Sequence, residues 1–140
     1  IMPNRTFAII KPDAIKNNFT GKIYNHILKS NFIILSSKLI KITKKQAEEF
    51  YKIHQNKPFY EELTNFMSSD RCMVLVLEKD NAVKEWRETI GNTNPEDAKN
   101  GTIRKLYATS LGENAVHGSD SDENAKKEIA FFFSELELLQ

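Results

Sequence analysis

The longest apolar run in the chain is Cys72-Met73-Val74-Leu75-Val76-Leu77, with Arg71 before it and Glu78 after it. A short, bounded run of this kind is typical of a central strand that is buried on both faces of a sheet. It is far shorter than the roughly 20 residues that a helix needs to cross a bilayer. We therefore predict a central strand over residues 72–77 and no membrane-spanning segment.

Apolar patterns on either side of this run predict further strands. Thr6–Ile10 is a β-branched and aromatic run that Pro12 breaks, so Lys11 should project from a strand end. Phe32–Ile42 is partly continuous and partly alternating, which predicts a second strand. A short additional strand is possible over Ala115–His117.

Helical spacing of apolar residues accounts for much of the remaining chain. From Thr20, apolar residues recur along one helical face and His26 falls off it, so we expect His26 in solvent. Thr43-x-x-Gln46 has the form of a capping box, followed by a helical face that reaches His54 and is ended by Pro58. The two faces consist of Ile23, Tyr24, Ile27 and Leu28, and of Ala47, Phe50, Tyr51 and His54.

Three further helices follow from the same signals. They are predicted over residues 59–67, over residues 81–90 with Gly91 closing the helix, and after the polar residues 119–122. Those polar residues offer an N-cap and an acidic first turn. The long glycine- and asparagine-containing segment 91–116 is of the kind that usually carries function in a compact domain.

Length and composition limit the class of protein. The 140 residues are 40% hydrophobic and 28% charged, which predicts one folded α+β domain over residues 1–140. A net charge of +1 does not favour non-specific binding of nucleic acid or membranes. A single cysteine excludes an internal disulfide, and together with three histidines it cannot build the usual structural zinc site. Without an N-terminal segment that resembles a signal peptide, we expect a cytoplasmic location.

The spacing of the glycines excludes two nucleotide-binding motifs. A Walker A loop needs glycines five positions apart, and a dinucleotide fingerprint needs them two and three apart. No two glycines of the chain are that close, since they stand at positions 21, 91, 101, 112 and 118. If the protein binds a nucleotide, side chains must hold its phosphates.

The segment with the strongest chemical signal is Asn114-Ala115-Val116-His117-Gly118-Ser119-Asp120-Ser121. His117 belongs to no apolar stripe, and it stands beside a glycine that lets the backbone approach a ligand. The start of the next helix directs free N–H groups at an anion. Spacing alone leaves two readings open, a functional histidine or a loop histidine next to an N-cap.

This segment resembles the signature of the nucleoside diphosphate kinases, and the resemblance covers nearly the whole chain. A departure from the family pattern is Ser69-Asp70-Arg71-Cys72, where bacterial members often have Ser-Gly-Pro before the strand. The other matching blocks are Lys11-Pro12-Asp13-Ala14, Phe50-Tyr51, Lys57-Pro58-Phe59-Tyr60, Trp86-Arg87, Gly91-Asn92-Thr93-Asn94-Pro95, Gly101-Thr102-Ile103-Arg104 and Glu128-Ile129-Ala130-Phe131-Phe132-Phe133.

The resemblance implies a ferredoxin-like antiparallel sheet covered by helices. It also implies transfer of the γ-phosphate between nucleoside tri- and diphosphates, such as ATP and GTP, through a phosphohistidine on His117. Attack would occur through Nδ1 by a ping-pong mechanism. The cofactor would be Mg²⁺, with Asp120 holding it through water. A homo-oligomer is implied, with tetramer and hexamer both left open.

Further site residues follow from the resemblance, position by position. Lys11 would contact the transferring phosphate and a ribose hydroxyl, and Asn114 would also contact the sugar. Phosphate contacts would come from Arg87, Thr93, Arg104 and His54. Taken singly, Lys11 could be a solvated strand end, and the two arginines could be surface ion-pair partners. Thr93 could be a turn hydroxyl and His54 a helix-end cap.

The resemblance also assigns the base and the surroundings of the histidine. Phe59 and Leu111 would sandwich the base without reading its edge, and the Tyr51 hydroxyl would lie near His117. Ser119 would bond to Glu128 and thereby orient the ring. From pattern alone, Phe59 and Tyr51 are core aromatics, and Ser119 and Glu128 are a helix cap and a solvated glutamate.

Two non-enzymatic readings compete with phosphotransfer. A ferredoxin-like sheet can serve as a nucleic-acid or regulatory nucleotide-binding module without catalysis. The near-neutral charge and the lack of a basic-aromatic strand motif weigh against nucleic acid. A purely structural oligomer would leave the polar cluster at residues 114–121 unexplained.

Overall fold

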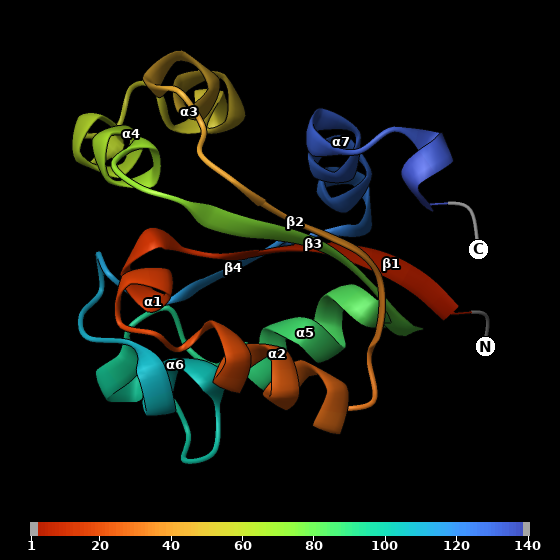
Figure 1. Cartoon of the computed structure of the whole chain (residues 1–140). Coiled ribbons are helices and arrows are strands. Elements are labelled where there is room, and N and C mark those ends of the chain that lie inside the picture. The colour runs from red at the N-terminus through yellow and green to blue at the C-terminus, as the bar shows by residue number, and fades with distance from the viewer. Residues whose placement is uncertain (1–2, 139–140) are drawn as a thin grey trace.

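The computed structural model describes residues 3–138, which form a four-stranded antiparallel sheet with helices on both faces (Figure 1). The strand order β2-β3-β1-β4 confirms the predicted ferredoxin-like α+β fold, and the described residues form a single domain. The strands are β1 (Pro3–Ile10), β2 (Ile33–Ile40), β3 (Cys72–Asp80) and β4 (Val116–Gly118).

The central strands β1 and β3 each contain a continuous apolar run, residues 7–10 and 72–77, because these parts contribute to a core on both faces of the sheet. On β1, Phe7 and Ile9 belong to one core, and Ala8 and Ile10 belong to the other. The same alternation occurs on β3, as expected for a strand buried on both sides. The prediction of a central strand over residues 72–77 is therefore confirmed.

Strand pairing, and not apolar pattern, sets the strand ends. β1 begins at Pro3 instead of Thr6, and β3 continues to Asp80, because the two pair in register from Pro3↔Asp80 to Ile10↔Met73. The backbone hydrogen bonds of this ladder do not depend on apolar side chains. β2 is shorter than predicted and contains a register shift between Ile34 and Ser36.

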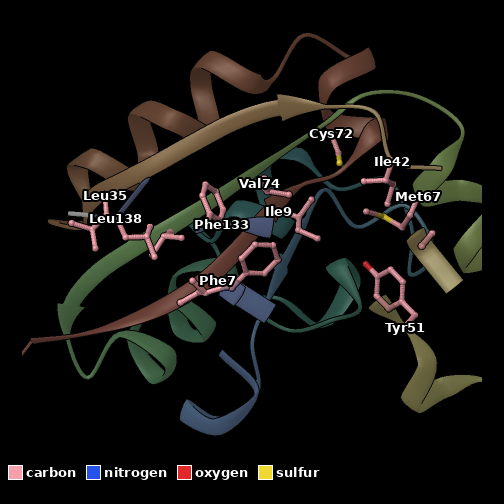
Figure 2. Close-up of a cluster of buried hydrophobic side chains, with 13 residues drawn as sticks. Phe7, Ile9, Leu35, Ile42, Tyr51, Met67, Cys72, Val74, Phe133 and Leu138 are labelled. Atoms are coloured by element: carbon pink, nitrogen blue, oxygen red, sulfur yellow. The ribbon is translucent and has the colours of Figure 1, made fainter. Parts of the chain in front are cut away.

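Helices cover the two faces in separate groups (Figure 1). Figure 2 shows the core on the first face, where Phe7 and Val74 of the sheet lie in one cluster with Tyr51 and Phe133. That face carries α3 (Lys44–Phe50), α4 (Tyr60–Ser68), α7 (Asp122–Phe132) and the 3₁₀ turns η1 (Lys52–His54) and η3 (Glu135–Leu138). The second face carries α1 (Pro12–Lys16), α2 (Thr20–Lys29), α5 (Ala82–Ile90) and α6 (Ile103–Tyr107), with η2 (Pro95–Asp97) between α5 and α6.

The capping box that begins α3 is present, but the helix ends earlier than predicted. Thr43 Oγ1 accepts the Gln46 N–H, and Gln46 Oε1 accepts the Thr43 N–H. The helix then stops at Phe50 and tightens into η1, so His54 leaves the predicted helical face. The prediction that this helix continues to Pro58 was therefore wrong, because the 3₁₀ turn η1 ends it before that proline.

The apolar face of α2 is narrower than predicted. Ile23 and Ile27 are fully buried, whereas Leu28 is 50% exposed. His26, expected in solvent, is only partly exposed, and its Nε2 atom is buried without a hydrogen-bond partner among the described residues. Burial, followed by the charge of Lys29, lowers the pKa of His26.

The C-terminal end of α5 and the N-terminal start of α7 are each fixed by a cap residue. Gly91 ends α5 with φ +89°, and a Cβ there would lie 2.6 Å from Thr102 Oγ1. The N-cap of α7 is Ser121, whose hydroxyl accepts the Asn124 N–H, so the reading of Ser119 as the cap was wrong. None of the helices described over residues 3–138 is long and apolar enough to span a membrane.

Candidate active site

A cavity of about 870 Å³ opens where β4, the end of β1, η1, α5 and α7 come together. The chain contributes to it from positions more than 100 residues apart, because Ile9 of β1 pairs with His117 of β4. Ten of the predicted site residues line it: Lys11, Tyr51, His54, Arg87, Thr93, Arg104, Asn114, His117, Asp120 and Glu128.

Three predicted site residues do not line this cavity. Ser119 is fully buried behind His117. Phe59 and Leu111 are 47% and 58% exposed, which contradicts the reading of Phe59 as a core residue. The Phe59 ring nevertheless lies 5.4 Å from the ring of His54, which does line the cavity.

Glu128 contacts the imidazole of His117. Glu128 Oε1 lies 2.8 Å from His117 Nε2 and accepts a hydrogen bond of 2.8 Å from Ser119 Oγ. An ionised carboxylate can only accept, so in the neutral imidazole that fits this contact Nε2 carries the proton and Nδ1 keeps the lone pair. Ser119 and Glu128 thus meet as the resemblance implied, and the solvated reading of Glu128 is wrong because its carboxylate is engaged.

Aromatic rings surround the His117 side chain. The rings of Phe50 and Phe7 lie edge-on to it, with centroids at 5.7 and 6.0 Å, and that of Tyr51 lies at 6.4 Å. The Tyr51 hydroxyl is buried and has no hydrogen-bond partner within residues 3–138. Burial raises the pKa of Tyr51, so this phenol is a neutral donor at physiological pH.

Lys11 and Asn114 form a buried pair beside the cavity. Lys11 Nζ donates to Asn114 Oδ1 at 2.8 Å, and Asn114 Nδ2 donates to the Thr93 carbonyl at 3.1 Å. Burial and the nearby Arg104 lower the pKa of Lys11 to about 8, against the opposing effect of Asp13. Lys11 is therefore a desolvated ammonium that an arriving anion would stabilise.

Arg104 is buried and donates to three main-chain carbonyls, so its reading as a surface ion-pair residue was wrong. Its guanidinium donates to the carbonyls of Asn114, Gly91 and Val116. Burial and then the charge of Arg87 lower its pKa to about 10, which leaves it a cation. Arg87 is exposed and faces the same cavity.

His54 and Asp120 lie near the mouth of the cavity. The His54 Nδ1 atom is buried and has no partner in the described part of the chain, and burial lowers the pKa of this imidazole. Asp120 is exposed and accepts a hydrogen bond from Asn124 Nδ2 at 2.6 Å. Within residues 3–138, no three histidine, cysteine or acidic side chains gather to hold a metal.

Sequence reasoning assigned no role to Asp13, although Lys11-Pro12-Asp13-Ala14 was noted as a block. Its buried Oδ2 accepts the Ala115 N–H at 3.0 Å. Ala115 has φ +72°, a left-handed conformation that costs a non-glycine residue about 1 kcal/mol. The aspartate therefore supports the strained turn that carries Asn114. The available signal was an acidic residue directly after Pro12, in the first turn of a helix.

Gly118 lines the cavity, and the absence of a side chain there also makes room for another group that the sequence did not indicate. A Cβ at this position would lie 2.6 Å from Trp86 Cδ1 and 3.2 Å from Ile90 Cδ1. The group that approaches the glycine is the indole of α5, and its Nε1 donates to the His117 carbonyl at 3.1 Å. Nothing in the sequence indicates that Trp86 and His117 meet.

Comparison with known proteins agrees with this geometry. A family model described as "Nucleoside diphosphate kinase" matches residues 4–138. The nucleoside diphosphate kinase of Flavobacterium psychrophilum is 56% identical over 131 residues, 94% of each chain. That of Persephonella marina is 52% identical over 136 residues, 97% of each chain.

Solved structures give the same result. A nucleoside diphosphate kinase from Aquifex aeolicus superposes with a TM-score of 0.96 at 41% identity, covering 99% of this chain and 100% of that one. One from Halobacterium salinarum, solved in complex with CDP, has a TM-score of 0.94 at 33% identity and covers 99% and 93%. On its sequence, fold and cavity, this chain belongs to the nucleoside diphosphate kinase family.

Proposed function

We propose that this nucleotide phosphotransferase moves the γ-phosphate of a nucleoside triphosphate to a nucleoside diphosphate through a phosphohistidine formed at Nδ1 of His117. The observation that carries the proposal is the 2.8 Å contact between His117 Nε2 and Glu128 Oε1 at a cavity lined by basic side chains. It leaves Nδ1 as the nitrogen with a free lone pair. A non-catalytic binding module would not need this orientation.

The reaction divides into two balanced steps. In the first, the Nδ1 lone pair attacks the γ-phosphorus, and the bond between that phosphorus and the β-phosphate oxygen breaks, its electron pair leaving with the nucleoside diphosphate. In the second, a phosphate oxygen of the acceptor diphosphate attacks the phosphohistidine and the N–P bond breaks. Because a neutral imidazole can attack phosphorus directly, positioning and charge neutralisation supply most of the catalysis.

The basic residues of the cavity would hold the phosphates. Lys11 and Arg87 supply positive charge, and Arg104 can use the N–H groups that its three carbonyl contacts leave free. Thr93 and His54 would donate to phosphate oxygens, and Asn114 to the ribose. The unpartnered Tyr51 hydroxyl would donate toward the histidine's phosphate.

The base would be bound by apolar contact alone. Phe59 and Leu111 are exposed aromatic and aliphatic side chains outside the polar cavity. Stacking and apolar contact do not read base edges, which fits broad use of ATP, GTP and other nucleotides. The substrates are nucleotides, and we propose that Phe59 and Leu111 are the residues that hold the base.

Mg²⁺ is the divalent metal that we propose as cofactor. The donor set fits a metal held mainly by substrate phosphates, since the described residues form no metal-binding cluster and Asp120, an exposed carboxylate of the cavity, could hold the metal through water. The metal would neutralise charge on the phosphates when bound. Asn124 fixes the direction of the Asp120 carboxylate through its 2.6 Å hydrogen bond.

The first prediction concerns the nucleophile. His117→Ala should abolish phosphotransfer and labelling by [γ-³²P]ATP, and should retain binding of ADP because the phosphate-holding residues remain. The label on the unaltered protein should be stable in alkali and labile in acid. His26→Ala, which changes a histidine of α2 away from the cavity, is the control and should still be labelled. Substantial turnover by His117→Ala would refute the mechanism.

The second prediction concerns the orienting pair. Ser119→Ala removes the 2.8 Å hydrogen bond to Glu128 and should lower the single-turnover phosphorylation rate by about tenfold. Ser121→Ala is the matched control, because it removes the N-cap of α7 and should cost about 1 kcal/mol of stability with no effect on that rate. Equal rates for Ser119→Ala and the unaltered protein would leave the serine a purely structural role.

The third prediction concerns the charge of Lys11, whose pKa of about 8 lies below its ordinary value. The amine is protonated below that pH and loses its charge above it, so ADP affinity should weaken as pH rises through about 8. Calorimetry in buffers of different ionisation enthalpy should detect proton uptake on binding at higher pH. Lys11→Met should remove this uptake and Lys99→Met should keep it; uptake that survives in Lys11→Met would contradict the assignment.

The fourth prediction is that the chain is a homo-oligomer, a tetramer or a hexamer. Within residues 3–138 no strand pairs with the outer edge of β2, where Ile33 and Leu39 are 57% and 49% exposed. Light scattering at micromolar concentration should give a multiple of the chain mass. Ile33→Lys should reduce it, whereas Leu136→Lys, at a 79% exposed position of η3, should not. A monomer at that concentration would refute the proposal.

A further inference from the structure

The main chain of His117 is held by a side chain that does not line the cavity. Trp86 of α5 is fully buried, and its indole Nε1 donates to the His117 carbonyl at 3.1 Å. The imidazole is fixed separately by Glu128, at its Nε2 atom. The histidine is therefore held at two points, its ring from α7 and its backbone from α5.

Trp86 also packs tightly against Gly118, the residue of β4 that follows His117. A Cβ on Gly118 would lie 2.6 Å from Trp86 Cδ1 and 2.9 Å from Trp86 Nε1, so the ring lies directly against the glycine backbone. Phe32 packs edge-on against the indole, with ring centroids 5.6 Å apart and planes at 86°. The indole Nε1 is therefore held close to the main chain of β4 by its own contacts with that strand.

Helix α5 also carries residues of the cavity wall. Arg87 directly follows Trp86 and lines the cavity, and the Gly91 carbonyl at the end of the helix accepts a hydrogen bond from Arg104. A displacement of β4 relative to α5 would therefore change the distance between the histidine and the basic residues. An in-line transfer is sensitive to displacements of this kind, because an error of 1 Å can cost about 100-fold in rate.

We propose that Trp86 is a positioning residue for phosphoryl transfer, and that its indole N–H holds the His117 main chain at the distance from the phosphates that attack by Nδ1 requires. The proposal rests on the proposed function of His117 as nucleophile. Replacement of an ordinary core residue would lower stability without a specific effect on the chemical step, whereas replacement of Trp86 should lower the rate of that step.

The chain has one tryptophan, which allows the N–H group to be removed without changing the shape of the side chain. Biosynthetic replacement of tryptophan by β-(3-benzothienyl)alanine puts sulfur in place of the indole N–H at position 86 alone. The analogue protein should fall about tenfold in single-turnover phosphorylation rate by ATP, with ADP affinity within about twofold of the natural protein. Trp86→Phe, which also lacks the donor, should show the same separation of rate from affinity.

Phe32→Leu is the matched control for packing. It removes an edge-on aromatic contact of the indole while leaving the N–H and the His117 carbonyl in place. Its thermal midpoint should fall, and its phosphorylation rate should stay near that of the natural protein. In the natural protein, the single indole ¹H–¹⁵N signal should shift when His117 is phosphorylated.

The outcomes separate this proposal from the proposed function. If the natural protein forms phosphohistidine at His117 and both donor-free proteins form it at the natural rate, Trp86 is not a positioning residue. A rate loss in Phe32→Leu as large as in the analogue protein would likewise reduce Trp86 to packing. If the natural protein forms no phosphohistidine on His117, the proposed function fails and the role of Trp86 fails with it.

Discussion

The antiparallel pairing of the three-residue strand β4 with β1 is the constraint on which the site depends. Ile9 pairs with His117, and main-chain bonds extend the contact on both sides, from Lys11 N–H to the Ala115 carbonyl and from Ser119 N–H to the Phe7 carbonyl. This pairing brings together residues that the chain separates by more than 100 positions. It also explains why a strand so short is stable, since its partner is a buried central strand.

The site gathers positive charge in a chain whose net charge is only +1. Lys11 and Arg104 are both 8% exposed, and their pKa values fall because burial disfavours the charged forms. Hydrogen bonds to an amide oxygen and to three carbonyls stabilise these cations until a polyanion arrives. Charge that is already desolvated and oriented acts on phosphate more strongly than charge on a free surface.

Much of the site followed from the sequence because its chemistry is concentrated in short segments. His117 with its polar neighbours, and Lys11 at the end of a strand before Pro12, were recognisable from residue type and order. The contacts that order the site were not recognisable, because each acts across the fold: Asp13 on the Ala115 N–H, Trp86 on the His117 carbonyl and Arg104 on the Val116 carbonyl. Hydrogen bonds to backbone atoms leave no pattern in the sequence, because any residue can supply the main-chain partner.

The sequence by itself indicated the strands, the helices other than α1 and α6, the single α+β domain and the likeness to one enzyme family, because apolar periodicity, caps and motif order are local properties of the chain. The tertiary structure decided the strand ends, the early end of α3 and the burial of Ser119, Arg104 and Asp13. It also decided that Gly118 makes room for an indole. These depend on which surfaces meet across the sheet, and contact between distant segments is set by packing and pairing that no local pattern encodes.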